Sequence, residues 1–224
     1  MVERFLNNPR LIYFMINFIG RSREYNDHLE GEVPKDLERL VHRLRWPIYL
    51  ESTPNIHLAC YFGEKNYANP RAQFPYDMPH PGLDIQANQG TPILLPTTGR
   101  IVKCKVDKIG GLTVGVYDEE NNLAYVFAHL DARQPPCELI EDTHTKWNSP
   151  YFLEAGKPIG KIGKWNYELP DFVNIPGEVL AIYGREFHHV HFEIMYINPR
   201  QKKPRFIEGV YTLNPLLLLQ KLKY

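Results

Sequence analysis

The sequence predicts a mainly β protein with an antiparallel sheet at its core and a short, partly helical N-terminal extension. From Asn55 onward, short apolar runs alternate with Gly, Pro and Asn, a texture typical of strands joined by tight turns. Before that point, apolar residues recur at helical spacing in the segment PKDLERLVHRLR at 34–45. At 224 residues the chain is long enough to bury a sizeable core. We therefore expect an extension over 1–54 and one domain with a C-terminal tail over 55–224.

The segment 34–45 predicts a short helix. Its apolar residues follow the i, i+3, i+4, i+7 pattern of one helix face; they are Leu37, Leu40, Val41 and Leu44. Pro47 follows and is expected to stop the helix.

A second apolar run, LIYFMINFI at Leu11–Ile19, lies further upstream. It is too short to cross a bilayer as a helix. It has the length of a signal-peptide core and follows Arg4 and Arg10, but no clear small-residue cleavage site comes after it. Both a signal peptide and a buried amphipathic helix stay open for this run, and we favour the helix.

Two pairs of strands are expected within the domain. The runs Thr91–Leu95 and Ile101–Val106 flank the turn sequence PTTG, and Leu112–Tyr117 and Leu123–His129 flank DEENN as a hairpin. In this pattern His129 ends a strand, where a side chain is well placed to point into a groove.

Two short motifs more than a hundred residues apart carry the chemistry. In His80-Pro-Gly-Leu-Asp84, the Pro-Gly pair makes a helix improbable, so His80 and Asp84 are expected on one face of extended chain. In His189-Val-His191, residues two apart share a face of a strand. Two imidazoles and one carboxylate, with a fourth position left for water, are typical of a catalytic zinc site.

At these motifs the chain resembles a known family. The blocks HPGLD, GTPILLPTTGRIV, FAHLD, AGKPIGKIG and HHVHFEI are similar, in order and rough spacing, to those of the lysostaphin/LytM-like zinc metalloendopeptidases. The resemblance covers about residues 75–200. It implies the duplicated-hybrid-motif fold, an antiparallel sheet with a groove that holds Zn²⁺, and hydrolysis of peptide bonds in peptidoglycan.

The resemblance also implies a role for each polar residue. The zinc ligands would be His80, Asp84 and His191, and the catalytic residues that are not ligands would be His129 and His189. One of these two takes the proton of the attacking water, and the other donates to the oxyanion or to the leaving amine. We favour His189 as the base because it is two residues from a ligand, but the division stays open.

Glu193 lies two residues after His191, so on a strand it shares that face. We expect it beside the site, in a supporting position, and not as the general base that a helical HExxH motif supplies.

The charge balance makes a nucleic-acid partner improbable. Lys plus Arg and Asp plus Glu each number 26, so no global positive field exists to attract phosphates. The expected partner is a peptidoglycan peptide, and the expected location is the cell envelope, either periplasmic or extracellular.

Three cysteines, at positions 60, 104 and 137, are too few for a disulfide framework and lack zinc-finger spacing. We expect buried thiols, one pair of which could bridge if the protein is exported.

Two long connections separate the motif blocks: Asp131–Glu154 and the aromatic-rich Lys164–Phe187. Because both join elements that carry site residues, we expect them to wall the substrate groove and to set specificity.

Two other functions remain open. One is a non-catalytic relative that binds peptidoglycan or activates another hydrolase. The other is a zinc peptidase that acts on protein substrates, including one that residues 1–54 keep inactive. The presence of all five polar residues favours the peptidoglycan enzyme.

Overall fold

The computed structural model describes residues 33–49, 57–60, 82–107, 111–138, 149–163, 188–197 and 210–221. In these ranges the elements are, in chain order, the 3-10 helix η2 (Lys35–Leu40), the strands β1 (His57–Cys60), β2 (Leu83–Gln86), β3 (Pro92–Leu94), β4 (Gly99–Asp107), β5 (Gly111–Asp118), β6 (Leu123–Leu130), β7 (Phe152–Leu153), β8 (Pro158–Lys161), β9 (His189–Ile197) and β10 (Val210–Leu213), and the helix α5 (Pro215–Leu218).

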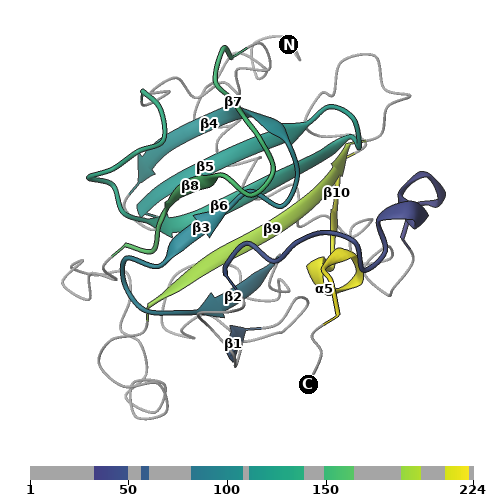
Figure 1. Cartoon of the computed structure of the whole chain (residues 1–224), viewed down its shortest axis with the longest axis horizontal. Helices are drawn as coiled ribbons and strands as arrows, with labels where there is room; N and C mark the ends of the chain where they lie inside the picture. The colour runs from purple at the N-terminus through teal and green to yellow at the C-terminus, as the bar shows by residue number, and fades with distance from the viewer. Residues whose placement is uncertain are drawn as a thin grey trace, which may run out of the picture.

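One large sheet dominates the described part of the chain (Figure 1). Its strands run in the order β1-β2-β9-β6-β5-β4-β7, and β10 also pairs with β9. All of these pairings are antiparallel. The predicted mainly β, antiparallel fold is therefore confirmed.

Strand β9 joins the two sides of this sheet. One edge of β9 pairs along its length with β6, while the other edge pairs first with β2 and then with β10. Strands β4, β5 and β6 form a meander, as expected from the hairpin around DEENN. The fold therefore places the last motif of the sequence, H-x-H, in the middle of the sheet.

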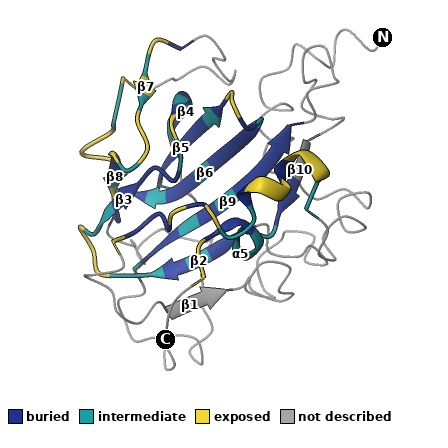
Figure 2. Cartoon of the chain, turned by 45° about the vertical axis from the view of Figure 1, so that its right-hand side comes forward, coloured by how far each residue is buried: buried dark blue, intermediate teal, exposed yellow. Residues whose placement is uncertain are grey.

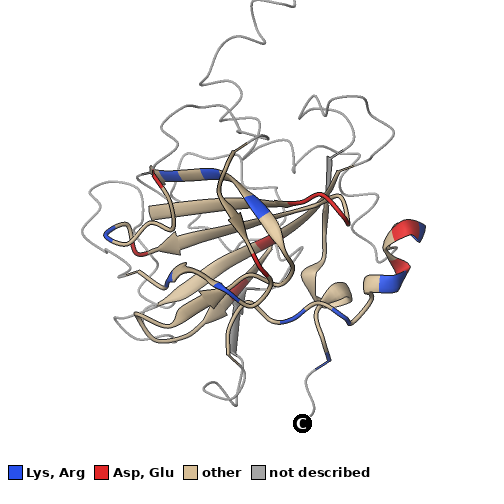
Figure 3. Cartoon of the chain, turned by 45° about the horizontal axis from the view of Figure 1, so that its top comes forward, with Lys and Arg blue, Asp and Glu red and all other residues tan. Residues whose placement is uncertain are grey.

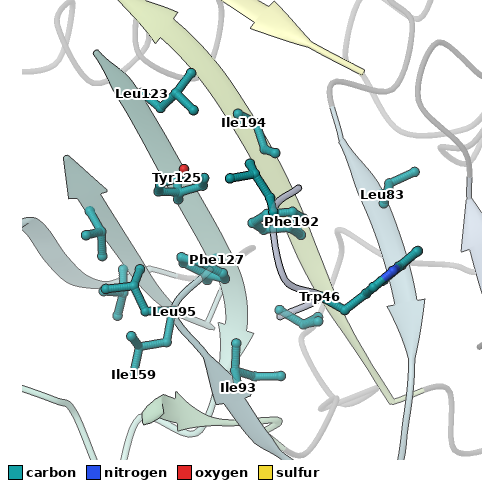
Figure 4. Packing of buried hydrophobic residues seen from close by; sticks show 14 of the residues in the cluster. Trp46, Leu83, Ile93, Leu95, Leu123, Tyr125, Phe127, Ile159, Phe192 and Ile194 are labelled. Carbon is teal, nitrogen blue, oxygen red and sulfur yellow. The ribbon is translucent and has the colours of Figure 1, made fainter. Parts of the chain in front are cut away.

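The main core lies on one face of the sheet. Alternate residues of β9, such as Phe192 and Ile194, pack there against Tyr125 and Phe127 of β6 (Figure 4). The rings of Phe127 and Phe192 lie 5.1 Å apart between centroids. Strands β3 and β8 form a separate two-stranded sheet that contributes Ile93 and other apolar residues to this core. Figure 2 shows that β6 and β9 are buried along most of their length.

The opposite face of β9 is different in character. Toward the end of the strand it carries the small apolar cluster of Met195 and Ile197 with Ala124 of β6. Toward its beginning, the alternation of a strand places His189 and His191 on this same face. Strand β4 of the sheet carries Arg100, Lys103, Lys105 and Asp107, whereas most of the remaining sheet is uncharged (Figure 3).

The predicted hairpin of β5 and β6 is confirmed, but the predicted pairing across PTTG is wrong. β4, β5 and β6 cover the predicted strands that begin at Ile101, Leu112 and Leu123. The strand predicted from Thr91, observed as β3, leaves the large sheet and pairs with β8. The intervening PTTG segment therefore connects two sheets.

The helix predicted over 34–45 is only partly correct. The structure has a 3-10 helix over Lys35–Leu40, whose buried residues Leu37 and Leu40 are three positions apart, the spacing that returns to one face of a 3-10 helix. Leu44, predicted on the same helix face, is buried in the core. The backbone of Leu44 is not helical, because it forms a β-bridge with Leu219.

That pairing joins residues 33–49 to the segment around α5. The Leu44 N–H donates to the Leu218 carbonyl at 2.9 Å, and the Gln220 N–H donates to the Leu44 carbonyl at 2.8 Å. The Trp46 indole N–H donates to the Gln220 carbonyl at 2.8 Å. This part of the predicted extension is thus hydrogen-bonded to the domain.

The apolar run Leu11–Ile19 lies outside the described residues. Among the residues that are described, no helix is long and apolar enough to cross a membrane.

Candidate active site

The site begins at the pairing of β2 with β9. Asp84 lies directly opposite His191 in the register of the two strands. Because paired residues of an antiparallel ladder project to the same face, their side chains meet: Oδ1 of Asp84 lies 2.8 Å from Nδ1 of His191. Each side chain is only 14% exposed. Two residues that are 107 positions apart in sequence are brought together by one backbone ladder.

His189 and His129 lie next to this pair. Nε2 of His189 is 3.9 Å from Oδ1 of Asp84, and the His189 side chain is only 4% exposed. The ring centroids of His129 and His189 are 4.6 Å apart, and those of His129 and His191 are 6.3 Å apart. The structure therefore gathers four of the five predicted polar residues, and the fifth, His80, lies outside the described residues.

His129 reaches the site through a β-bulge. On β6, core residues alternate up to Phe127, but the next core residue is Leu130, three positions later. The pairing with β5 shifts register at this point, and His129 has a φ of 65°. A bulge of this kind re-aims a side chain. It turns His129 away from the main core and toward His189.

Glu193 contacts His191 directly, which the strand spacing alone does not predict. It was expected beside the site, and its Oε1 lies 2.7 Å from Nε2 of His191. A carboxylate accepts hydrogen bonds only, so the Nε2–H of His191 is the donor. With Asp84 at Nδ1 and Glu193 at Nε2, both nitrogens of the His191 ring face carboxylates.

The charge state of His191 follows from these two neighbours. Burial lowers the pKa of His191, but hydrogen bonds to Asp84 and Glu193 and the charges of both carboxylates outweigh it, so that the pKa rises to about 10. In the metal-free protein the ring is therefore an imidazolium at neutral pH, with one N–H directed to each carboxylate.

The close packing of β2 against β9 explains the glycine of the HPGLD motif, Gly82. A Cβ at this position would collide with the carbonyl oxygen of Phe192 and lie 3.0 Å from Cγ of Glu193. Only glycine lets the chain that enters β2 approach the backbone of β9 this closely. The close approach sets the depth at which Asp84 meets His191.

The donor atoms fit part of a zinc site. A carboxylate oxygen and an imidazole nitrogen converge here, and both are donors that zinc accepts. Within the described ranges, no group of three or more His, Cys, Asp or Glu is arranged to hold a metal ion. The third predicted ligand, His80, is not among those residues.

The two predicted walls are described only in part. Residues 131–138 and 149–154 of the first connection belong to the described ranges, and the second connection, Lys164–Phe187, lies outside them. The first connection begins at Asp131, two residues after His129. Its start is held by a hydrogen bond from the Asp131 N–H to the Lys161 carbonyl at 2.8 Å.

No protein-family model matches the chain, and no curated protein sequence does. Solved structures are similar to it at low identity. The catalytic domain of lysostaphin from Staphylococcus simulans is 19% identical, with 66% of this chain and 86% of that domain covered and a TM-score of 0.42.

Two larger proteins give similar values. Csd3 from Helicobacter pylori is 19% identical over 81% of this chain, with a TM-score of 0.45, and a zinc-containing peptidase from Vibrio cholerae is 15% identical over 69%, with a TM-score of 0.41. The chain spans only 36% and 37% of these two proteins. The structures similar to this chain thus include lysostaphin, a member of the family that the sequence motifs resemble.

Proposed function

We propose that this chain is a zinc-dependent endopeptidase that hydrolyses peptide bonds in the stem peptides or cross-bridges of peptidoglycan. The observation that carries the proposal is the meeting of Asp84, His129, His189 and His191 on one face of the sheet. These residues come from three strands, and the sequence motifs assign each of them a role in such an enzyme.

In this proposal His80, Asp84 and His191 hold the zinc ion. Bound zinc would acidify a water molecule and polarise the scissile carbonyl. Asp84 and His191 lie side by side on this face of the sheet, and each side chain is 14% exposed. Glu193 keeps the Nε2–H of His191 engaged, which leaves Nδ1, on the Asp84 side, as the ligand atom.

His189 and His129 would transfer the protons. His189 is the more deeply buried of the pair, and its Nε2 lies 3.9 Å from Oδ1 of Asp84; we assign it as the base that takes the proton of the attacking water. His129, held on the bulge, would then donate to the oxyanion or to the leaving amine. The two imidazoles lie 4.6 Å apart between ring centroids, so both can reach the same reacting carbonyl from one side.

The proposed place of action is the cell envelope, where peptidoglycan lies. The connections Asp131–Glu154 and Lys164–Phe187 would wall the groove and select the peptide, and residues 1–54 would form an extension to the domain of 55–224.

The test is digestion of purified sacculi with the full chain, with products identified by mass spectrometry and zinc measured in the same samples. Alanine variants of His80, Asp84 and His191 are expected to lose both zinc and cleavage. Variants of His129 and His189 are expected to retain zinc and to lose about 10²–10⁴-fold in rate, the usual worth of a positioned acid or base.

Three results would contradict the proposal. Sacculi that are bound but left intact would indicate a non-catalytic protein. Cleavage of a folded protein but not of sacculi would indicate a different substrate. A His189 variant that loses zinc while the His191 variant keeps it would reverse the two histidine roles.

A further inference from the structure

Two cysteines meet at the sheet, away from the histidines. Cys104 lies on β4 with its side chain fully buried in the main core. Cys137 lies in the connection after β6, is half-buried, and packs against the same core. The two residues are 33 positions apart in sequence, so their meeting is a product of the fold.

The contact between them is direct. The Cys104 thiol donates a hydrogen bond to the Cys137 carbonyl at 3.9 Å from sulfur to oxygen. The two side chains also hydrogen-bond to each other, and this contact is the largest cause that raises the pKa of the Cys137 thiol and lowers that of Cys104. A disulfide requires two cysteine side chains that face each other at short range, and the direct contact of Cys104 with Cys137 agrees with that requirement.

We propose that Cys104 and Cys137 form a disulfide bond in an oxidising compartment, and that this bond fastens residues 131–138 to β4. The compartment is the cell envelope of the proposed function, and the inference depends on that location. The two thiols lose two protons and two electrons as the sulfur–sulfur bond forms, and a disulfide of the glutathione or dithiol-oxidoreductase class accepts them and becomes two thiols.

The bond would have a structural consequence next to the site. Residues 132–135 are exposed, and the backbone bond from Asp131 to Lys161 holds only the beginning of the segment. Cys137 lies at the other end. A disulfide there would fix both ends of the segment 131–138, which follows His129, and would close a loop that includes β5 and β6.

The test uses the purified full chain, oxidised with glutathione disulfide, alkylated and digested with trypsin. Cys104 stands between Lys103 and Lys105, so it is released on the dipeptide 104–105, and Cys137 is released on the peptide 134–146. We expect these two peptides to be joined and two hydrogen atoms lighter than the pair after reduction. Reduction should also lower Tm by roughly 8–15 °C, the scale set by closure of a loop of this length in a chain of this size.

Variants separate this pair from the third cysteine. Cys60→Ser should keep both the linked peptide and the Tm shift, whereas Cys104→Ser and Cys137→Ser should each lose both. The proposal would be overturned if Cys104 and Cys137 were both alkylated after oxidation, or if either formed a bond with Cys60. A Tm unaffected by reduction would show that the bond does not stabilise the attachment of residues 131–138 to β4. Because none of these measurements uses peptidase activity, their failure is distinct from a failure of the proposed function.

Discussion

At the scale of single residues, His191 is defined by the two carboxylates beside its ring. Asp84 faces the nitrogen that would bind metal, and Glu193 faces the other. Such a partner fixes the ring orientation and the tautomer of a ligand histidine. A residue that never touches the metal is therefore expected to affect how well the metal is held.

We predict that Glu193→Ala weakens zinc binding by about 10–100-fold, because the His191 ring loses the acceptor that orients it. Glu193→Gln should weaken binding less, since its amide oxygen still accepts from Nε2–H. Competition with a chromophoric chelator measures both dissociation constants. Glu154→Ala, at an exposed position, serves as the control. Equal zinc affinity in the Glu193→Ala variant and the unaltered protein would show that the contact has no positioning role.

The raised pKa of His191 predicts how zinc binding depends on pH. With a pKa of about 10, the ring carries a proton at neutral pH that zinc must displace from Nδ1. Acidification from pH 8 to pH 6 should therefore raise the apparent dissociation constant for zinc by about tenfold per pH unit. Activity should fall together with zinc occupancy as the pH is lowered over this range. A dissociation constant that stays level over this range would exclude proton competition at this ligand.

At the scale of elements, the bulge on β6 determines where His129 points. Its φ of 65° lies in the left-handed region, which Asn tolerates and β-branched residues avoid. We expect His129→Asn to retain nearly full thermodynamic stability and His129→Val to lose about 1–2 kcal/mol, although both remove the imidazole. Urea denaturation compares them. Equal stability of the two variants would mean that the strand can straighten at this position.

The close approach of β2 to β9 gives a second prediction at this scale. Gly82→Ala would place a methyl group against the Phe192 carbonyl, so β2 must move away from β9 and Asp84 from His191. We expect a loss of about 2–4 kcal/mol together with weaker zinc binding. At Gly90, where φ is 82° and a Cβ meets nothing within 4 Å, alanine should cost only about 1–2 kcal/mol and leave zinc binding intact. Comparable zinc affinity in the two variants would contradict the role of Gly82.

Local patterns in the sequence predict the strands well and their partners poorly. Alternating residues such as Tyr125 and Phe127 mark β6, and the two-residue spacing of H-x-H places both histidines on one face, because strand periodicity is a local property. The pairing of β3 with β8 depends on non-local contacts and has no local signal. The bulge leaves a trace in the sequence: large apolar residues recur two positions apart up to Phe127 and then three positions later at Leu130.

At the scale of the whole molecule, the core extends upstream of the sheet. Leu37, Leu44, Trp46 and Ile48 are all buried in the same cluster as the central strands. Apolar burial of this kind stabilises the fold whatever its distance from the site.

We therefore predict that Leu37→Ala lowers the free energy of unfolding by about 2–5 kcal/mol without changing the affinity for zinc. The exposed neighbour Lys35, replaced by alanine, should change stability by no more than about 0.5 kcal/mol. Denaturant unfolding and chelator competition provide the two measurements. A Leu37→Ala variant as stable as the Lys35→Ala variant would show that this segment contributes nothing to the core.

The pairing of Leu44 with Leu219 also bears on the order of events during synthesis. A growing chain that has passed β6 still lacks β9, the strand that lies between β2 and β6. At that stage the edge of β6 that later pairs with β9 has no partner, and residues 37–48 lack the segment around α5 with which they later pair. Contacts between such distant positions form slowly. The nascent protein must therefore stay incompletely folded until residue 219 has left the ribosome.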